Sequence, residues 1–409
     1  MGAAGVARAG AAGDLGVRRG LTQRAWARDA ATLVGARIAF WLLAALALVW
    51  APAEPARRIG EAYGGWSDLL VRTFAQWDAV WFVQIALNGY DDVPAAAAFF
   101  PLYPALVHGV AWVTGSVLVA GTLVSLAAAA AAAAVLAELA RPVLGARGAR
   151  DAVLFLALFP LAFVFTAVYS DALFLALAAG AFLAAQRNRP LLAGVLGGLA
   201  TGTRLLGLAL LPALALLLAA RGGGRRALAL RLAPLALLPA AVGLYALHLD
   251  RELGDPWAFR HAQAGWNRSL DPLGPVGGLL DAVNAAGRAA RVLASVPYAP
   301  SHEHAVALWN LSHLAILAAV VWLTWVAWRR LGAAHGAYAV ATLVIVLSVP
   351  AEGFPLVSLP RFVLGDFPIF LALASLTAGR PRARDAVLWA FAALGAAAAI
   401  AFSRGVWVA

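Results

Sequence analysis

The chain has 409 residues, of which 63% are hydrophobic and 12% charged, and its formal charge is +11 at neutral pH. A water-soluble globule could not bury that much apolar surface, so the composition indicates a polytopic membrane protein. All 31 basic residues are Arg and Cys is absent, which excludes disulfides, thiol chemistry and Cys-ligated metals. The Arg residues lie between apolar stretches, which is typical of positive-inside topology and not of nucleic-acid binding.

The order of polar and apolar segments predicts one membrane domain behind a short arm. Residues 1–30 carry five Arg among Gly and Ala, and we interpret them as a disordered basic cytoplasmic arm. Residues 31–409 form the membrane domain, with outer loops at 52–116 and 250–303. Apolar runs predict about eleven transmembrane helices. These spans are expected at 31–51, 117–140, 152–168, 172–186, 190–202, 204–220, 227–249, 304–328, 334–350, 361–378 and 385–403.

The distribution of charge decides the topology where length alone does not. Residues 99–140 are long enough for two crossings, but only one crossing, at 117–140, keeps the Arg cluster at 141–150 inside. We therefore expect 99–114 to form an amphipathic helix at the outer interface, ending near Gly115. With this assignment, inner segments hold twenty Arg against five acids, and outer segments hold eleven Arg against fifteen acids. The N-terminus is expected in the cytoplasm and the C-terminus outside.

The first outer loop contains the most informative polar stretch, in which Asp78 lies among aromatic residues. On a helix, Asp78 shares a face with Trp81, Phe82 and Ile85, and Gly89 is suited to end that helix. A carboxylate fixed in this way can act as a general base that removes a proton from a hydroxyl group. The alternative is a solvated loop acid beside aromatic residues at headgroup depth.

Five blocks between residues 70 and 370 resemble the signature of the PIG-V family (GPI mannosyltransferase 2-like) of integral-membrane mannosyltransferases. In the first, Trp-Asp, Ile-Ala-x-x-Gly-Tyr and Phe-Phe-Pro-x-x-Pro follow one another over 77–104. The second, at 159–174, contains Phe-Pro and Tyr-Ser-acid-x-Leu-Phe, with Asp171 where the family pattern has Glu. The others are Thr-Arg-x-x-Gly at 203–207, Gly-Asp-Pro with His-x-Gln at 254–263, and Pro-Arg-aromatic at 360–362.

The resemblance implies an all-α polytopic membrane protein with a C-type glycosyltransferase (GT-C) fold, whose outer loops build the active site. It implies inverting transfer of a sugar, most often mannose, from a polyprenyl-phosphate donor. No cofactor is expected, and neither a Walker loop nor a Gly-x-Gly-x-x-Gly motif after a strand occurs. The expected partners are the lipid-linked donor, membrane lipids and an acceptor that is a lipid-linked glycan, a cell-wall glycan or a protein. The expected location is the cell membrane, with an extracytoplasmic active site.

The resemblance also assigns roles to individual residues. Asp78 is the expected catalytic base. Arg204 and Arg361 are expected to bind the donor phosphate, because a guanidinium can hold a phosphate through two hydrogen bonds. Substrate contacts are expected from Trp77, Trp81, Tyr90, Tyr103, Tyr169, Asp171, His261 and Gln263.

Several of these residues have a structural alternative. Asp171, or Ser170 before it, can simply cap the next helix. Arg204 can extend to the lipid headgroups, and Arg361 can neutralise Asp366, an acid inside a span that needs a partner. The His residues at 302–304 point apart on a helix, so we expect no metal.

A rival function comes from a different class of protein. A multi-pass lipid or solute transporter or flippase would also combine many spans with buried charges, and would place polar groups at mid-bilayer in repeat-related positions. Here the polar motifs gather at one face, which favours the enzyme. The exclusive use of Arg and the Ala runs favour a bacterium with a GC-rich genome as the source. Bacteria make no GPI anchor, so the identity of the acceptor stays open.

Overall fold

The computed structural model describes residues 3–50, 73–90, 94–295 and 301–408, and gives side chains in these ranges from residue 25 onward, Ser295 excepted. Within these ranges the regular elements are α-helices and 3-10 helices, and the one strand-like pairing is an isolated bridge between Arg268 and Ala351. The fold is therefore all-α, as the apolar runs predict.

Long apolar helices alternate along the chain with short elements. The α-helices are α1 Ala3–Trp50, α3 Ala79–Asn88, α4 Leu102–Thr114, α5 Val117–Leu158, α6 Asp171–Gln186, α7 Pro190–Thr203, α8 Leu210–Ala219, α9 Arg225–Leu232, α10 Leu237–Leu253, α11 Ala258–His261, α12 Pro275–Ser295, α13 His302–Leu331, α14 Ala333–Leu347, α15 Leu359–Phe362, α16 Phe367–Thr377 and α17 Pro381–Ser403. The 3-10 helices are η1 Pro94–Ala98, η2 Ala162–Phe165, η3 Leu205–Ala209, η4 Ala233–Ala236, η5 Ala262–Trp266 and η6 Val363–Gly365.

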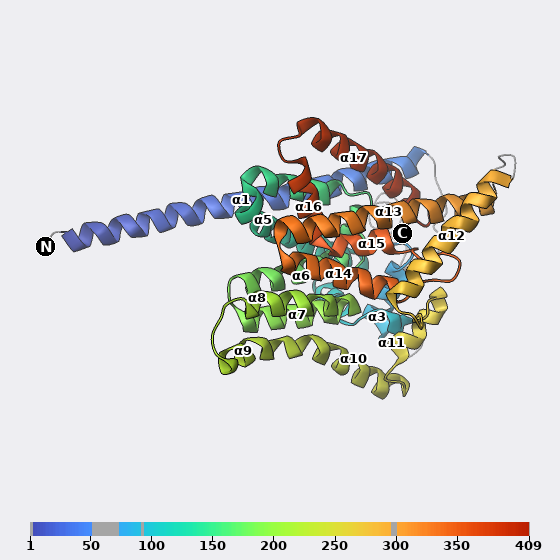
Figure 1. The fold of residues 1–409 in the computed structure, drawn as a ribbon, viewed down its shortest axis with the longest axis horizontal. Coiled ribbons are helices and arrows are strands. Elements are labelled where there is room, and N and C mark those ends of the chain that lie inside the picture. The colour runs from blue at the N-terminus through green and yellow to red at the C-terminus, as the bar shows by residue number, and fades with distance from the viewer. Residues whose placement is uncertain (1–2, 51–72, 91–93, 296–300, 409) are drawn as a thin grey trace.

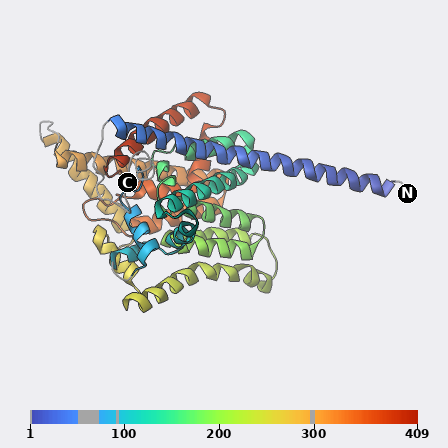
Figure 2. The ribbon, with the colours of Figure 1, turned by 180° about the vertical axis from the view of Figure 1, so that it is seen from behind.

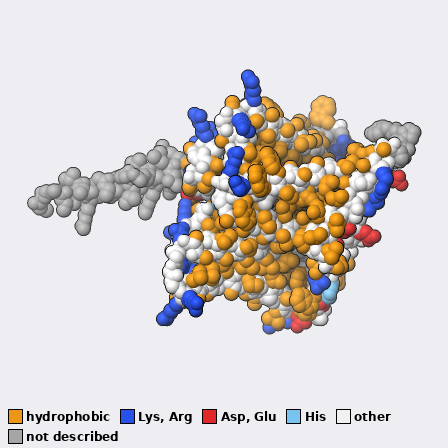
Figure 3. Space-filling model, viewed as in Figure 1, with side chains coloured by type: hydrophobic (Ala, Val, Ile, Leu, Met, Phe, Trp, Pro, Cys, Tyr) orange, Lys and Arg blue, Asp and Glu red, His pale blue; other side chains and the backbone are white. Residues whose placement is uncertain are grey.

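The long helices lie side by side in a bundle (Figure 1). Helix α1 packs against α5 and α17, and α5 packs in turn against α6 (Figure 2). The short helices α3 and α11, together with α12, gather at the end of the bundle opposite the turn between α8 and α9. Hydrophobic side chains cover the sides of the bundle, whereas Arg side chains gather near the α8–α9 end and acidic side chains near the other (Figure 3). A lipid-facing belt between two polar ends produces this surface.

Five helices of the described chain are long and apolar enough to cross a membrane, and a sixth candidate is the pair Leu359–Gly365 and Phe367–Thr377, bent by 84°. Shorter apolar helices, including α6, α7 and α14, lie in the same bundle. The expected polytopic membrane architecture is thus confirmed, while the count of eleven spans stays a prediction. The five helices are Ala25–Trp50, Val117–Leu158, Arg225–Leu253, His302–Leu331 and Pro381–Ser403.

Two expectations near the start of the chain have different outcomes. Helix α4 ends at Thr114, and Gly115 takes the left-handed conformation at φ 68°, as expected from its lack of a Cβ. Residues 3–30, which we expected as a disordered arm, are helical in the structure and continue into α1. The loop between α1 and α3 lies outside the described residues up to residue 72, as do residues 91–93.

The expected span at 152–168 is wrong as a single helix. Helix α5 runs on from the preceding span through a break at Gly145, where φ is 67°, and ends at Leu158. Pro160 has no N–H to donate and favours an extended Phe159, whose ψ is 136°, so the helix stops there. Turns and η2 then lead to α6, so that residues 169–171 lie at the end of the bundle that holds α3 and α11.

Close packing of α7 fixes the position of the turn that follows it. A Cβ at Gly194 would lie 2.3 Å from the carbonyl oxygen of Pro234, and one at Gly198 would lie 2.9 Å from that of Leu237. The two glycines are four residues apart, so they share the face of α7 that meets η4 and α10. This contact holds α7 against its neighbour and thereby sets where Arg204, the residue after α7, emerges.

Candidate active site

A cavity of about 1210 Å³ opens among the loops at the α3 and α11 end of the bundle. Its walls come from segments far apart in the sequence, including α3, the α7–η3 turn, α11, the end of α14 and α15. Aromatic rings form much of the lining. Trp81 stacks on Phe99 with ring centroids 6.0 Å apart, and Trp266 packs edge-on against both rings at 5.6 Å. Such a surface suits a sugar ring, which has an apolar face and polar edges.

Asp78 lies in this cavity because hydrogen bonds from Tyr169 fix the turn before α3. Trp77 takes a positive φ of 55°, and Asp78 is the N-cap residue of α3. The Tyr169 hydroxyl donates a hydrogen bond of 3.1 Å to the Gln76 carbonyl and accepts one of 3.2 Å from the Asp78 backbone N–H. The Asp78 side chain is 13% exposed, so the carboxylate is largely shielded from solvent and still lines the cavity.

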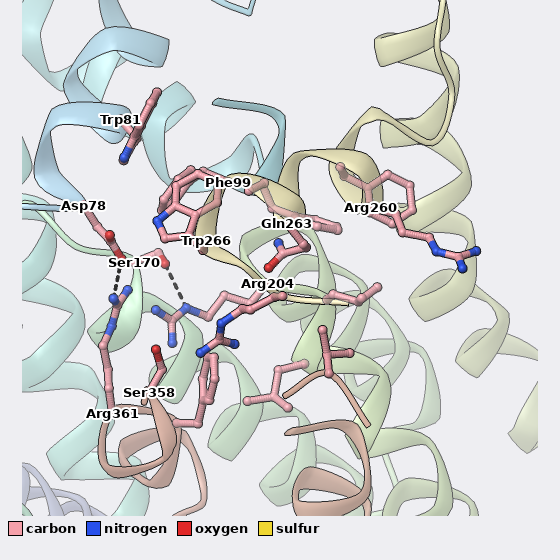
Figure 4. A pocket seen from close by; sticks show the side chains of 18 of the residues that line it. Asp78, Trp81, Phe99, Ser170, Arg204, Arg260, Gln263, Trp266, Ser358 and Arg361 are labelled. Atoms are coloured by element: carbon pink, nitrogen blue, oxygen red, sulfur yellow. Dashed lines mark hydrogen bonds and ion pairs between the residues drawn. The ribbon is translucent and has the colours of Figure 1, made fainter. Parts of the chain in front are cut away.

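Two carboxylates and two guanidinium groups meet at and just behind the floor of the cavity, where Figure 4 shows Asp78 beside Arg361 and Arg204 beside Ser170. Arg361 donates to Asp78 and also contacts Asp171 at 3.3 Å. Arg204 pairs with Asp171 through two contacts of 2.8 and 2.9 Å, and its Nε donates to Ser170 Oγ at 3.1 Å. We call Asp78, Asp171, Arg204 and Arg361 the charged cluster. Its two positive and two negative groups balance, which makes burial of all four tolerable.

The structure overturns the alternative pairings. Arg361 does not neutralise Asp366, which lies at the break between η6 and α16 with both carboxylate oxygens buried and no hydrogen-bond partner in the described part of the protein. Ser170 has the expected position as the N-cap residue of α6, but its side chain makes no capping hydrogen bond and its hydroxyl accepts from Arg204. Asp171 lies in the first turn of α6 and is shared by two arginines.

The expected site residues divide into two groups. Those that line the cavity are Trp77, Asp78, Trp81, Arg204, His261, Gln263 and Arg361. Those that are buried behind it are Tyr90, Tyr103, Tyr169 and Asp171. Direct substrate contact by the second group does not fit their positions, and hydrogen bonds to neighbouring backbone or to the charged cluster occupy their polar atoms instead.

The buried tyrosines brace the walls. Tyr90 donates a hydrogen bond of 2.8 Å to the Phe99 carbonyl, which also accepts one of 3.1 Å from Tyr245. Tyr103 donates to the Gly121 carbonyl at 3.0 Å and thereby links α4 to α5. Burial raises the pKa of the Tyr90 phenol well above its usual value, so it stays a neutral donor. These contacts hold Phe99 and the start of α4 in place.

The Gly-Asp-Pro block forms a rim above the cavity. Asp255 Oδ2 lies 2.7 Å from His261 Nδ1, and the Asp255 carboxylate also accepts a hydrogen bond of 2.9 Å from the Trp257 N–H. The hydrogen bond with His261 lowers the pKa of Asp255. His261 is 66% exposed, so its ring is available to a ligand at the cavity mouth.

The cavity lining also includes residues that the sequence did not mark, among them Arg268 and Trp407. Arg268 belongs to the expected outer loop at 250–303, yet it is only partly exposed and lies within the cavity. Trp407 follows α17, outside the motif blocks, and packs edge-on against Trp77 at 5.2 Å. No local motif marks these positions, since their placement depends on how distant loops meet.

Residues 92–248 match the family model described as dolichyl-phosphate-mannose-protein mannosyltransferase, and no curated protein matches the chain. Together with the all-helical membrane bundle, this match supports a membrane mannosyltransferase-like protein with the GT-C fold that uses a polyprenyl-phosphate sugar. It does not support the PIG-V family specifically, so the finer resemblance stays an interpretation. The match includes Asp171 and Arg204, whereas Asp78 and Arg361 lie outside it.

Proposed function

We propose that this protein moves a sugar from a polyprenyl-phosphate donor to an acceptor hydroxyl at the extracytoplasmic face of the cell membrane, and that this sugar is mannose. The observation that carries the proposal is the joint placement of Asp78, Arg204 and Arg361 in one aromatic-lined cavity. A base and two cations beside a platform for sugar rings are the groups that transfer from a phosphate leaving group requires.

The reaction follows from the charges that develop in it. The acceptor oxygen attacks the anomeric carbon from the side opposite the phosphate, and its proton passes to the Asp78 carboxylate. The bond between the anomeric carbon and the phosphate oxygen breaks, and its electron pair stays on the phosphate. Because a lipid phosphate is a good leaving group, no general acid is needed, and the arginines stabilise the negative charge that collects there. Attack from the opposite side inverts the anomeric centre.

The pair between Arg361 and Asp78 gives the donor a second role. Arg361 is shared by Asp78 and Asp171, so the Asp78 carboxylate is held by a cation. A donor phosphate competes with Asp78 for the same guanidinium, and its arrival would free the carboxylate to act as a base. Donor binding before acceptor activation is the order that this competition favours.

The apolar part of the cavity suits the lipid chain of such a donor. Leu205 and Leu206 of η3 line it together with Ile345 and Val346 of α14. Leu205 is 37% exposed, so this wall continues to the outside of the bundle. A phosphate at the charged cluster would thus lie between a prenyl chain along these residues and a sugar against the aromatic rings.

The test uses membranes from cells that produce wild-type protein or Asp78→Asn at equal abundance. Each is given polyprenyl-phosphate mannose labelled in the sugar, and the label is followed into lipid, glycan and protein fractions, with polyprenyl-phosphate glucose as the matched donor. We expect label from mannose to enter one acceptor fraction in the wild type, and the Asn variant to lose ~10²–10⁴-fold of that rate. If neither donor gives transfer that depends on Asp78, the enzyme proposal fails, and a transporter becomes the better explanation.

A further inference from the structure

Two of the arginines that line the cavity have no carboxylate partner among the described residues, and one of them, Arg268, is partly buried. Of the four that line it, Arg204 and Arg361 belong to the charged cluster, whereas Arg260 and Arg268 form no ion pair with any described residue. Arg260 is exposed, and its guanidinium points away from Asp78 in Figure 4. Arg268 is only partly exposed, and its guanidinium donates no hydrogen bond within the described ranges. Of these two unpaired arginines, Arg268 is therefore the one whose position suits ligand binding.

The backbone of Arg268 is fixed from two sides. Asn267 takes a left-handed conformation at φ 53°, which turns the chain back at the end of η5. The Arg268 N–H then donates to the Gln263 carbonyl at 3.1 Å, and the Glu352 N–H donates to the Asn267 carbonyl at 2.9 Å. An isolated antiparallel bridge joins Arg268 to Ala351. The segment after α14 therefore holds the loop in register.

The side chain of Arg268 is also supported. Its guanidinium carbon lies 5.6 Å from the centroid of the Phe362 ring, and Phe362 follows Arg361 in α15. A planar guanidinium over an aromatic face keeps its edge donors free for other partners. This contact places the cation on the same short helix that carries the Arg361 side chain.

Arg268 adds a positive charge that the charged cluster does not balance. Burial lowers the pKa of Arg268 to about 10, so it stays protonated near neutral pH, and the nearby Asp78 carboxylate favours that charged form. Because the charged cluster is neutral in itself, Arg268 makes the inner part of the cavity positive. A partly buried cation without a fixed counter-charge is unfavourable until an anion arrives.

We propose that Arg268 is the receptor for the phosphate of an incoming prenyl phosphate ester, and that it holds this anion before Arg361 exchanges Asp78 for it. The identity of the lipid rests on the proposed function, whereas the anion site rests on the geometry alone. The donor and the polyprenyl phosphate released after transfer share the recognised chemistry, a phosphate group on a prenyl chain. Arg268 thus contacts both donor and product.

The test measures binding directly in purified full-length protein in detergent. Quenching of Trp fluorescence follows the addition of farnesyl phosphate, with farnesol as the uncharged control and inorganic phosphate as the lipid-free one. We expect Arg268→Gln to weaken farnesyl phosphate binding by ~10–150-fold, the loss of one charge-assisted hydrogen bond, and to leave farnesol unchanged. Arg268→Lys should retain most of the binding, and Arg260→Gln, which removes an exposed cation that points away from Asp78, should bind within about twofold of wild type.

A measurement on the wild type alone guards against misfolded variants. Phenylglyoxal modifies arginines, and mass spectrometry reports each site. We expect farnesyl phosphate to protect Arg268 and not Arg260, and farnesol to protect neither. Equal modification of Arg268 with and without farnesyl phosphate would overturn the proposal, as would equal binding losses in Arg260→Gln and Arg268→Gln.

Failure of this inference is distinct from failure of the proposed function. If Arg268 binds the phosphate but the wild type transfers no sugar, the anion site stands and the enzyme assignment fails. If sugar transfer depends on Asp78 while Arg268→Gln binds farnesyl phosphate normally, the enzyme stands and the role of Arg268 fails. Protection by inorganic phosphate as strong as that by farnesyl phosphate would overturn the requirement for a prenyl chain.

Discussion

Asp171→Asn should lower the stability of the protein more than Asp78→Asn does, although both acids contact Arg361. The difference follows from which cation each change leaves alone. Without the Asp78 charge, Arg361 still has Asp171. Without the Asp171 charge, Arg204 keeps only the Ser170 hydroxyl, because Asp171 is its sole carboxylate partner in the described chain.

The sizes of the two effects can be worked out from the contacts. Asp171 is 1% exposed and receives both arms of Arg204, at 2.8 and 2.9 Å, so an Asn there leaves a buried guanidinium uncompensated. Breaking a buried pair in this way costs ~3–5 kcal/mol, whereas losing one hydrogen bond at Asp78 costs ~1–2 kcal/mol. Since domains are stable by only ~5–15 kcal/mol, the first change removes a large share of the stability.

The assay is thermal unfolding of detergent-solubilised protein, followed by loss of monodisperse protein after heating. Asp171→Glu, which keeps the charge, is the matched control and should melt well above Asp171→Asn. Asp78→Asn should melt close to the wild type while losing transfer. If Asp171→Asn melts within about 2 °C of Asp78→Asn, Asp171 does not hold the cluster together, and a role for it at the substrate regains support.

Other changes test the remaining parts of the site and topology. Arg204→Gln and Arg361→Gln should each lower kcat/KM for the donor by ~10–150-fold, the effect of one lost charge-assisted bond, and affect the acceptor KM less; the reverse pattern in steady-state kinetics would contradict the donor-phosphate role. Gly207→Ala places a Cβ 2.5 Å from backbone atoms of Thr201, whereas Gly202→Ala meets nothing closer than 3.7 Å, so only the first should reduce both yield and transfer. Reporter tags after Arg226 and Arg382 should lie in the cytoplasm, and tags after Pro275 and at the C-terminus should lie outside; a cytoplasmic tag at Pro275 would mean that residues 190–220 cross only once.

Much of the fold could be predicted because it depends on local chemistry. Apolar runs, Gly115 after α4 and Pro at the first turn of α7 and α17 mark elements that the structure contains. The placement of Asp78, Arg204 and Arg361 in one cavity agrees with the motif blocks. These features require only that a residue pattern be read within a few turns of helix.

The pairing of charges could not be predicted in the same way. Arg361 and Asp366 are close in sequence, which suggested that they neutralise each other, but the chain bends by 84° between α15–η6 and α16 and separates them. Arg361 instead meets Asp78 and Asp171, each far away in sequence. The role of Arg268 escaped for a similar reason, because burial of a loop residue depends on which distant segments cover it.

The contact between Trp77 and Trp407 has a consequence for biogenesis. One ring precedes α3 and the other follows α17, and α17 also packs against α1, so the cavity wall joins early and late parts of the polypeptide. During synthesis the early helices leave the ribosome and enter the bilayer long before α17 is made. The wall therefore closes only after α17 inserts, and nascent chains that stall before α17 carry Asp78 and the arginines without a complete cavity wall. Contacts between such distant segments form late and slowly in folding.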